Sequence, residues 1–265
     1  RDLTRPVRDG VERQAGARVR DERAPNLDHE PRRVAQAMTD CVNEATLGDQ
    51  EEFVMRRIDD ARQAGARLLN CQPDEVSLVG PTSLALSFVA AGLNFRKGDN
   101  ILIYHDDYPS NVYPWMALAQ KGVEVRLMNI RELGVIRPRD VLGQVDENTR
   151  LVALASCHFI SGYRLDHAAI GAELRKRKIL FCLDAIQTLG AFPTTVEHVD
   201  FLAADAHKWL LGPKRTGLLY VRRDRIAAAI SEIKRAGYDV FLVLEATIGF
   251  NKCEDEESPE DEAED

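Results

Sequence analysis

The sequence predicts an α/β protein, a three-layer sandwich built around a mostly parallel seven-stranded sheet. Seven short apolar runs are spread over residues 76–221. Most of the gaps between these runs hold a helix-length amphipathic stretch or a cluster of turn residues. Strands joined by helical crossovers run parallel and are covered by helices on both faces, which makes three layers.

The expected strands are short and apolar, and turn or helix signals bound them. They are Val76–Val79, Asn100–Tyr104, Val123–Leu127, Leu151–Ala155, Ile179–Leu183, Val199–Ala203 and Gly217–Val221. No helix-length segment separates the last two, so one strand is expected to run antiparallel. Ligands of such sheets bind at the carboxyl ends of the strands, so residues just past each strand are the candidates for a site.

The remaining segments are expected to flank this sheet. Residues 1–30 are rich in Arg, Asp and Glu and predict a loose arm, and residues 31–74 predict two helices, Pro31–Leu47 and Gln50–Leu69. The large domain is expected to span residues 75–236 and to end in a helix, Arg225–Ala236. Residues 254–265 carry nine acids and no base and predict a disordered tail.

Composition and charge argue against several classes of function. The chain has 265 residues, 45% of them hydrophobic, and a net charge of −8. Because the acidic tail accounts for that charge, the body has no basic field for nucleic acid. No stretch has the length and apolar character of a membrane span or a signal peptide. The five cysteines are scattered, which predicts free thiols in a reducing compartment, the cytoplasm, and the histidines show no metal-ligand spacing.

Lys208 is the most informative residue of the chain. It lies in the segment DAHKWLLGP, residues 205–213, just after an expected strand. Asp184 opens the segment DAIQ, residues 184–187, just after another. A lysine that forms an imine and a carboxylate that faces a protonated ring nitrogen are what a Schiff-base cofactor requires. The structural alternatives are a helix cap for Asp184 and a solvated side chain for Lys208.

These two motifs, D-A-x-Q and H-K-W-L-x-G-P, resemble the class V aminotransferase branch of the fold type I pyridoxal-phosphate (PLP) enzymes. That branch includes cysteine desulfurases, isopenicillin N epimerase-like proteins and kynureninases. The resemblance covers roughly residues 75–222, which is the large domain only. It implies that PLP is the cofactor, that Lys208 carries it as an aldimine and then serves as general base, and that Asp184 faces the ring nitrogen. It places Gln187 at the phenolic oxygen of the ring and His207 at the phosphate.

Further cofactor contacts are expected in the turns after the first, second and fourth strands. Thr82 and Ser83 precede the expected helix Leu84–Asn94, and a helix N-terminus can bind phosphate, although a plain cap would look the same. Tyr108 is expected to stack on the cofactor, or else to pack on the core. His158 is expected to contact the ring hydroxyl, unless it is structural.

Two residues bear on the substrate and on the subfamily. Arg164 is expected to meet a substrate carboxylate, or to be a surface arginine. Asp205 departs from the desulfurases, which have Ser or Thr there as a phosphate ligand. Because an acid beside a phosphate is unfavourable, Asp205 is expected to point elsewhere and to argue against a desulfurase. The epimerase-like subgroup fits better, on residues 107–111 (DYPSN) and 161–164 (SGYR).

The expected function is therefore a PLP-dependent transferase, lyase or isomerase that acts on a small amino acid as a homodimer. Neither the substrate arginine nor the Gly-Thr turn of full-length relatives is found after residue 236, so residues 237–253 are interpreted as a remnant of the small C-terminal domain. The chain is then a fragment of an enzyme, a shortened paralogue with weak turnover, or an inactive dimerising or regulatory scaffold. An NAD- or ATP-binding domain is disfavoured, because no GxGxxG or GxxxxGK[ST] follows a strand.

Overall fold

A computed structural model provides the structure of the chain, and it describes residues 31–44, 46, 51–226, 238–242 and 248–252. The predicted arm (1–30), the acidic tail (254–265) and all but the start of the predicted helix 225–236 lie outside the described residues. No described helix combines the length and the apolar character needed to cross a membrane.

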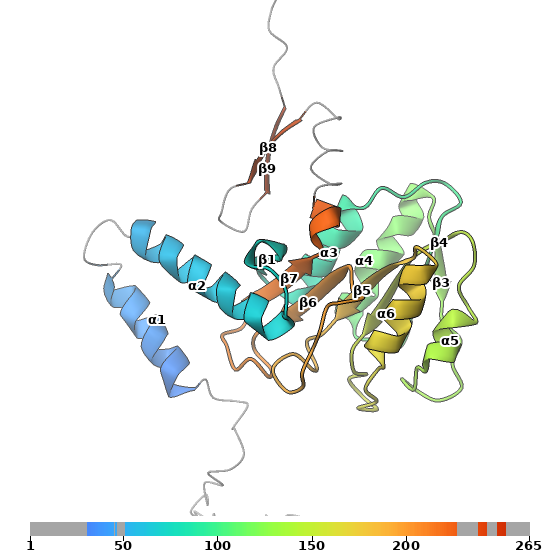
Figure 1. The fold of residues 1–265 in the computed structure, drawn as a ribbon, viewed down its shortest axis with the longest axis horizontal. Helices are drawn as coiled ribbons and strands as arrows, with labels where there is room; N and C mark the ends of the chain where they lie inside the picture. The colour runs from blue at the N-terminus through green and yellow to red at the C-terminus, as the bar shows by residue number, and fades with distance from the viewer. Residues whose placement is uncertain (1–30, 45, 47–50, 227–237, 243–247, 253–265) are drawn as a thin grey trace, which may run out of the picture.

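Seven strands form one sheet in the order β1-β7-β6-β5-β4-β2-β3 (Figure 1). They are β1 (Val76–Val79), β2 (Asn100–Ile103), β3 (Glu124–Leu127), β4 (Thr149–Ala155), β5 (Leu180–Asp184), β6 (Phe201–Asp205) and β7 (Gly217–Val221). β7 runs antiparallel to β1 and β6, and all other pairs are parallel. The predicted sheet is confirmed, and β7 is its antiparallel strand.

The helices also follow the predicted order. They are α1 (Arg32–Glu44), α2 (Glu51–Leu69), α3 (Thr82–Gly92), α4 (Tyr113–Met116), α5 (Pro138–Leu142) and α6 (His167–Lys176), with 3-10 turns η1 (Pro73–Glu75), η2 (Pro109–Asn111) and η3 (Ala117–Lys121). α3 begins two residues before its predicted start, which puts Thr82 and Ser83 in its first turn.

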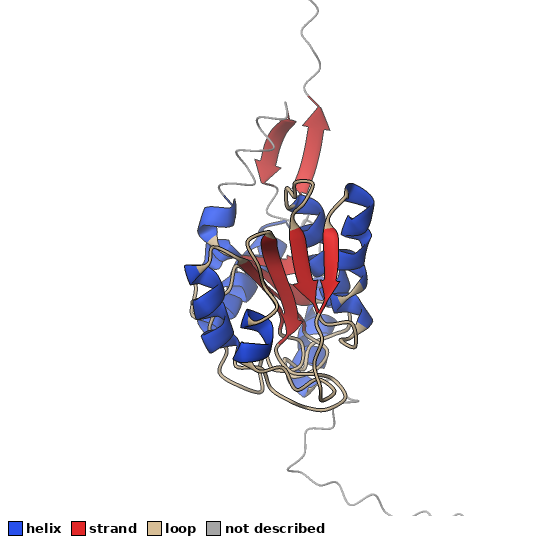
Figure 2. Ribbon diagram, turned by 90° about the vertical axis from the view of Figure 1, so that its right-hand side faces the viewer, coloured by secondary structure: helices blue, strands red, loops and turns tan. Residues whose placement is uncertain are grey.

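Two hydrophobic clusters, one on each face of the sheet, make the layers. Helices α2, α5 and α6 pack on one face, and α3, α4 and η3 cover the other (Figure 2). β4 shows how one strand serves both clusters, since Val152 and Leu154 point to the first while Leu151 and Ala153 point to the second. The predicted three-layer sandwich is therefore confirmed.

A separate two-stranded antiparallel sheet is formed by β8 (Tyr238–Leu242) and β9 (Ile248–Lys252). It lies in residues 237–253, and the interpretation of that segment as a domain remnant stays a prediction.

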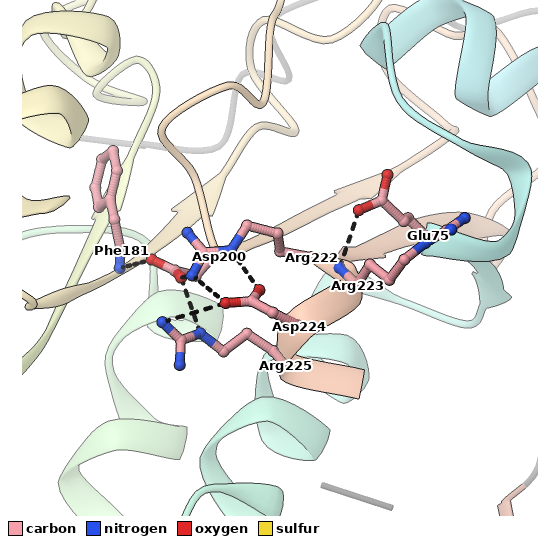
Figure 3. Close-up of polar contacts among 7 residues, drawn as sticks. All are labelled: Glu75, Phe181, Asp200, Arg222, Arg223, Asp224 and Arg225. Carbon is pink, nitrogen blue, oxygen red and sulfur yellow. Dashed lines mark hydrogen bonds and ion pairs between the residues drawn. The ribbon is translucent and has the colours of Figure 1, made fainter. Parts of the chain in front are cut away.

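A buried ion-pair cluster ties the segment after β7 to the sheet (Figure 3). Asp200, 4% exposed and just before β6, accepts a hydrogen bond from the Phe181 amide at 3.0 Å. Its carboxylate also pairs with Arg222 at 2.8 Å and Arg225 at 3.1 Å. Arg222 in turn bonds the more exposed Asp224 at 2.6 Å. The buried Asp200 carboxylate, with three donors, therefore anchors the described residues that follow β7.

We expect Asp200→Ala to lower the free energy of unfolding by about 3–5 kcal/mol, because it leaves partly buried guanidinium groups without a counter-charge. Denaturant unfolding of the full chain measures this loss. Asp224→Ala removes the exposed partner of the same arginines and is the matched control, expected to cost about 1 kcal/mol or less. Equal losses in the two variants would contradict the assignment of Asp200 as the anchor.

Candidate active site

Five loops meet at one edge of the sheet, where β1, β2, β4, β5 and β6 end. β1 and β6 point the same way because both run antiparallel to β7. Hydrogen bonds cross from loop to loop: the Asp205 amide donates to Thr82 Oγ1 at 2.9 Å, and the Ala155 amide donates to Asp107 Oδ2 at 3.0 Å. The edge thus gathers most of the predicted site residues from segments far apart in the chain, as expected for an α/β sheet.

Lys208 lies in the loop after β6, with its side chain half-buried. Its Nζ is 5.9 Å from the centre of the Tyr108 ring, so amine and ring face one another. The loop is closed by a bond from the Gly212 amide to the Ala206 carbonyl at 2.9 Å. Gly190, at φ +94°, packs against it so closely that a Cβ would lie 2.8 Å from the Trp209 carbonyl oxygen. A larger residue at position 190 would displace this loop, so Gly190 helps to position Lys208.

Burial lowers the pKa of the Lys208 amine, while the negative charges of Asp184 and Asp205 oppose this shift. A lowered pKa leaves more of the amine neutral at a given pH. The neutral form is the nucleophile and the base that the sequence predicts at this position.

Asp184 ends β5 and is only 2% exposed. Its Oδ1 accepts a hydrogen bond from the Ile186 amide at 3.0 Å. In the described part of the chain it forms no ion pair with a lysine, arginine or histidine. Burial raises its pKa from 3.8 to about 7, and the charge of Asp107 adds to the rise, while the Ile186 bond and Lys208 lower it. A buried carboxylate that lacks a cation fits the protonated ring nitrogen of a bound PLP.

Thr82 and Ser83 open helix α3, as the phosphate prediction requires. The amides of Leu84 and Ala85 bond to the carbonyl of Pro81, which leaves those of Thr82 and Ser83 ahead of the first intrahelical bonds. Thr82 is buried, and Ser83 lines a cavity of about 550 Å³ together with Ser87, Tyr108, Pro109, Ser110, Tyr113 and Pro114. Amides at a helix start that have no intrahelical partner, with hydroxyl side chains beside them, suit a phosphate.

Asp205 turns toward His207. Its Oδ2 lies 3.2 Å from His207 Nδ1, within ion-pair range although the two groups are not aligned as a hydrogen bond. Its Oδ1 has no hydrogen-bond partner among the described residues. The carboxylate, 6% exposed, is therefore in contact with the histidine that is predicted to hold the phosphate.

His158 has hydrogen-bond partners on both ring nitrogens. It is 4% exposed; its Nδ1 accepts from the Ser161 amide at 3.2 Å, and its Nε2 lies 2.9 Å from the Asp106 carbonyl oxygen. Because an imidazole has two nitrogens and both have partners here, neither is left for a cofactor hydroxyl. These contacts favour the structural alternative, in which His158 fastens the loop after β4 to the loop after β2.

Three other predicted residues lie at or near the site edge. Tyr108 is 50% exposed and meets Phe159 edge-on at 5.4 Å, so it is not packed into the core. Gln187 is half-buried in the turn after Asp184. Arg164 is exposed, with its guanidinium 4.6 Å above the Phe192 ring. Their cofactor and substrate contacts stay predictions.

Sequence reasoning missed Gly190 and Asp107. Both residues can be read in the sequence, Gly190 six positions after Asp184 and Asp107 beside Tyr108. Nothing in the local sequence indicates that Gly190 packs against the Lys208 loop or that Asp107 bonds to the end of β4. No three acidic, histidine or cysteine side chains of the described residues gather as a metal site would require.

Comparison with known proteins adds a decisive observation. Residues 29–253 match the family model described as aminotransferase class-V. The chain belongs to this family. The family resemblance and the PLP cofactor predicted from the sequence are thereby confirmed, and a lysine, a buried carboxylate and a helix start placed as above fit that cofactor.

The relatives are named for sulfur chemistry. A probable cysteine desulfurase of Methanothermobacter thermautotrophicus is 36% identical over 171 residues, 64% of this chain and 43% of the relative. A cysteine desulfurase IscS of Pseudoalteromonas translucida is 29% identical over 78% of this chain and 54% of its own length. The chain thus spans about half the length of the curated relatives it matches. The expectation that Asp205 argues against the desulfurase branch is not supported by these matches.

Solved structures share the fold. A cystine C–S lyase, C-DES, in complex with cysteine persulfide matches with a TM-score of 0.69 at 23% identity, over 75% of this chain and 56% of that one. The apo cysteine desulfurase of Thermococcus onnurineus NA1 matches with a TM-score of 0.63 at 25% identity, over 67% and 45%.

Proposed function

We propose that the chain is the cofactor-binding part of a PLP-dependent lyase that acts on a sulfur-containing amino acid such as cysteine or cystine. The observation that carries the proposal is the placement, at one sheet edge, of Lys208, whose pKa is lowered, and of Asp184, whose buried carboxyl has no ion-pair partner among the described residues. The names of the relatives favour a lyase over the epimerase-like or transferase reactions. An inactive scaffold is not favoured, because it would not need Asp184, Gln187, His207 and Lys208 together.

PLP, when bound, supplies an electron sink for the bonds of the substrate α-carbon. Lys208 attaches the cofactor and then moves the proton at that carbon. Asp184 keeps the ring nitrogen protonated, and Tyr108 covers one face of the ring. Thr82, Ser83 and His207 hold the phosphate, Gln187 contacts the phenolic oxygen, and Arg164 receives the substrate carboxylate. A homodimer and a cytoplasmic location remain part of the proposal.

Two of the described cysteines, Cys157 and Cys182, are candidates for the sulfur acceptor of a desulfurase reaction. A desulfurase needs a cysteine thiolate to accept sulfur, and burial raises the pKa of Cys157, the cysteine in the loop after β4, with Arg164 opposing the shift. Cys182 is fully buried in β5, and its pKa is raised well above the ordinary value. Neither is a good nucleophile in this state. We therefore do not propose either of these two thiols as a sulfur acceptor.

The first test is the visible spectrum of the full chain incubated with PLP, followed by borohydride reduction and peptide mapping. We expect a visible absorption band and a reduced pyridoxyl group on Lys208. Absence of the band, or a label spread over surface lysines, would overturn the proposal and favour the scaffold.

We expect Asp205→Ser to tighten PLP binding about tenfold or more. The Asp205 carboxylate lies 3.2 Å from His207 Nδ1, and the backbone amide of the same residue donates to Thr82 Oγ1. Its negative charge therefore opposes the phosphate that these residues are proposed to hold, and like charges in this range repel by more than about 1.4 kcal/mol at protein-like permittivity, about tenfold in affinity. Titration of the apo-protein by absorbance measures the dissociation constant. Asp106→Ser, at an exposed acid, is the control with no expected change; unchanged or weaker binding in Asp205→Ser would place the phosphate away from Asp205.

A further inference from the structure

Asp107 is a buried acid that the proposed mechanism does not use. It follows β2 and is 6% exposed. Its Oδ1 accepts a hydrogen bond from the Tyr108 amide at 2.8 Å, and its Oδ2 accepts from Asn111 Nδ2 at 3.1 Å and from the Ala155 amide at 3.0 Å. No lysine or arginine of the described residues forms an ion pair with it. A buried, cation-free carboxylate is costly, so three donors at this position call for an explanation.

The three bonds connect two loops of the site. Ala155 is the last residue of β4, and Tyr108 directly precedes the 3-10 turn η2 in the loop after β2. β2 and β4 are neighbours in the sheet, and their last paired residues are Ile103 and Ala153. Asp107 therefore links the two strands beyond that pair, at their carboxyl ends. The loop that carries Tyr108 is thereby fixed to the rigid sheet.

The link continues into the core. Asn111 is 1% exposed, and its Oδ1 accepts a bond from Trp115 Nε1 at 3.0 Å. Trp115 is fully buried in α4, within the cluster that covers the α3 face of the sheet. The Asp107 carboxylate is therefore fixed by the Asn111 side chain, and it in turn fixes the backbone amide of Tyr108.

Tyr108 depends on this support. Its side chain is half-exposed, and its ring meets Phe159 edge-on at 5.4 Å and faces Lys208 Nζ at 5.9 Å. A ring with so little packing takes its position from its backbone, and Asp107 accepts the hydrogen bond of that backbone amide. A loosened amide would let the ring leave the face of Lys208.

We infer that Asp107 is the positioning residue that holds Tyr108 against the cofactor face beside Lys208. The inference rests on the proposed function. Asp107 does not touch the reacting atoms in this arrangement; it acts through Tyr108 and the end of β4.

Asp107→Asn tests the inference with nearly unchanged shape. An asparagine has one acceptor oxygen for donors that now bond to two, so its NH2 group faces at least one N–H group in either orientation. We expect amide hydrogen exchange at Tyr108 or Ala155 in the apo-protein to accelerate about tenfold or more, the effect of losing one charge-assisted bond. We also expect PLP affinity to fall about tenfold and the visible band of the holo-protein to shift.

Trp115→Phe is the matched control, because it removes only the far bond of the same chain, from Trp115 Nε1 to Asn111. It is expected to lower stability and to change exchange at Tyr108 and Ala155, PLP affinity and the band far less than Asp107→Asn does. The inference is overturned if Asp107→Asn behaves as the unmodified protein does, or if Trp115→Phe alters these readouts equally.

The two proposals fail in different ways. If the unmodified chain takes up no PLP, the proposed function fails whatever Asp107 does, and the cofactor-facing part of the inference fails with it. If the unmodified chain binds PLP on Lys208 but Asp107→Asn leaves affinity, band and exchange unchanged, only the inference about Asp107 fails.

Discussion

Lys208→Ala is expected to eliminate the covalent attachment of PLP and to lower turnover by at least about 10⁴-fold. Loss of a positioned general base alone lowers rates by about 10²–10⁴-fold, and this variant also loses the nucleophile that attaches the cofactor. The measurement is the visible band, the borohydride-fixed label and the rate of sulfur release from cysteine or cystine. Because Lys208 is half-buried without an ion-pair partner among the described residues, the fold is expected to tolerate the change.

Lys214→Ala provides the control for this variant. Lys214 is exposed and lies six residues downstream in the same loop, so its removal tests for a general effect of losing a lysine there. We expect band, label and turnover to stay as in the unmodified protein. A Lys208→Ala variant that keeps a borohydride-stable label would show that another lysine carries the cofactor.

Asp184→Asn is expected to make the apo-protein more stable and the enzyme much less active. Burial raises the pKa of Asp184 from 3.8 to about 7, so between these values the folded protein binds more protons than the unfolded chain. The free energy of unfolding therefore falls as the pH rises through this window and levels off above about pH 7. Asparagine lacks the charge, so at pH 8 the variant should gain on the order of 2–4 kcal/mol, an upper range since each pKa unit is about 1.4 kcal/mol.

The same substitution removes the partner of the protonated ring nitrogen. We expect turnover to fall by at least about 100-fold, as when one preorganised charge-stabilising group is lost. Denaturant unfolding of the apo-protein at pH 5 and pH 8 tests the first effect, and the turnover assay tests the second. Glu147→Gln, at an exposed acid, is expected to change neither. A stability difference between Asp184→Asn and the unmodified protein that does not grow with pH would show that Asp184 is not charged at pH 8.

A variant that is more stable but less active would show that the native Asp184 carboxylate serves function and lowers the free energy of unfolding. Asp184 contrasts in this respect with Asp200, which has two arginine partners and whose loss is expected to destabilise. Both acids are buried, but Asp184 is the last residue of β5 whereas Asp200 precedes the start of β6, and only Asp200 has arginine partners among the described residues.

Some of the observed strands begin later than the sequence predicts. Val123 was expected to begin a strand, but its amide bonds to the Leu118 carbonyl and completes the turn after η3 instead. The sequence predicts that β6 begins at Val199, but the Val199 amide bonds to the Val196 carbonyl in a turn, and the strand starts at Phe201. Apolar character marks a buried segment, while hydrogen bonds to other segments decide where the strand begins.

The sequence by itself determined the layer architecture, the order of the strands along the chain and the presence of an antiparallel strand in the last pair, because each depends on local periodicity, and its short motifs predicted Asp184 and Lys208 as parts of one site. Only the tertiary structure decided that both His158 nitrogens are occupied, that Asp205 faces His207, and that Asp107 supports Tyr108. The contacts of His158 with Asp106 and of Asp107 with Ala155 join residues 52 and 48 positions apart, and the Asp205 amide bonds to Thr82 across 123 positions. Side-chain partners across a fold are set by the packing of loops at the sheet edge, which no local pattern encodes.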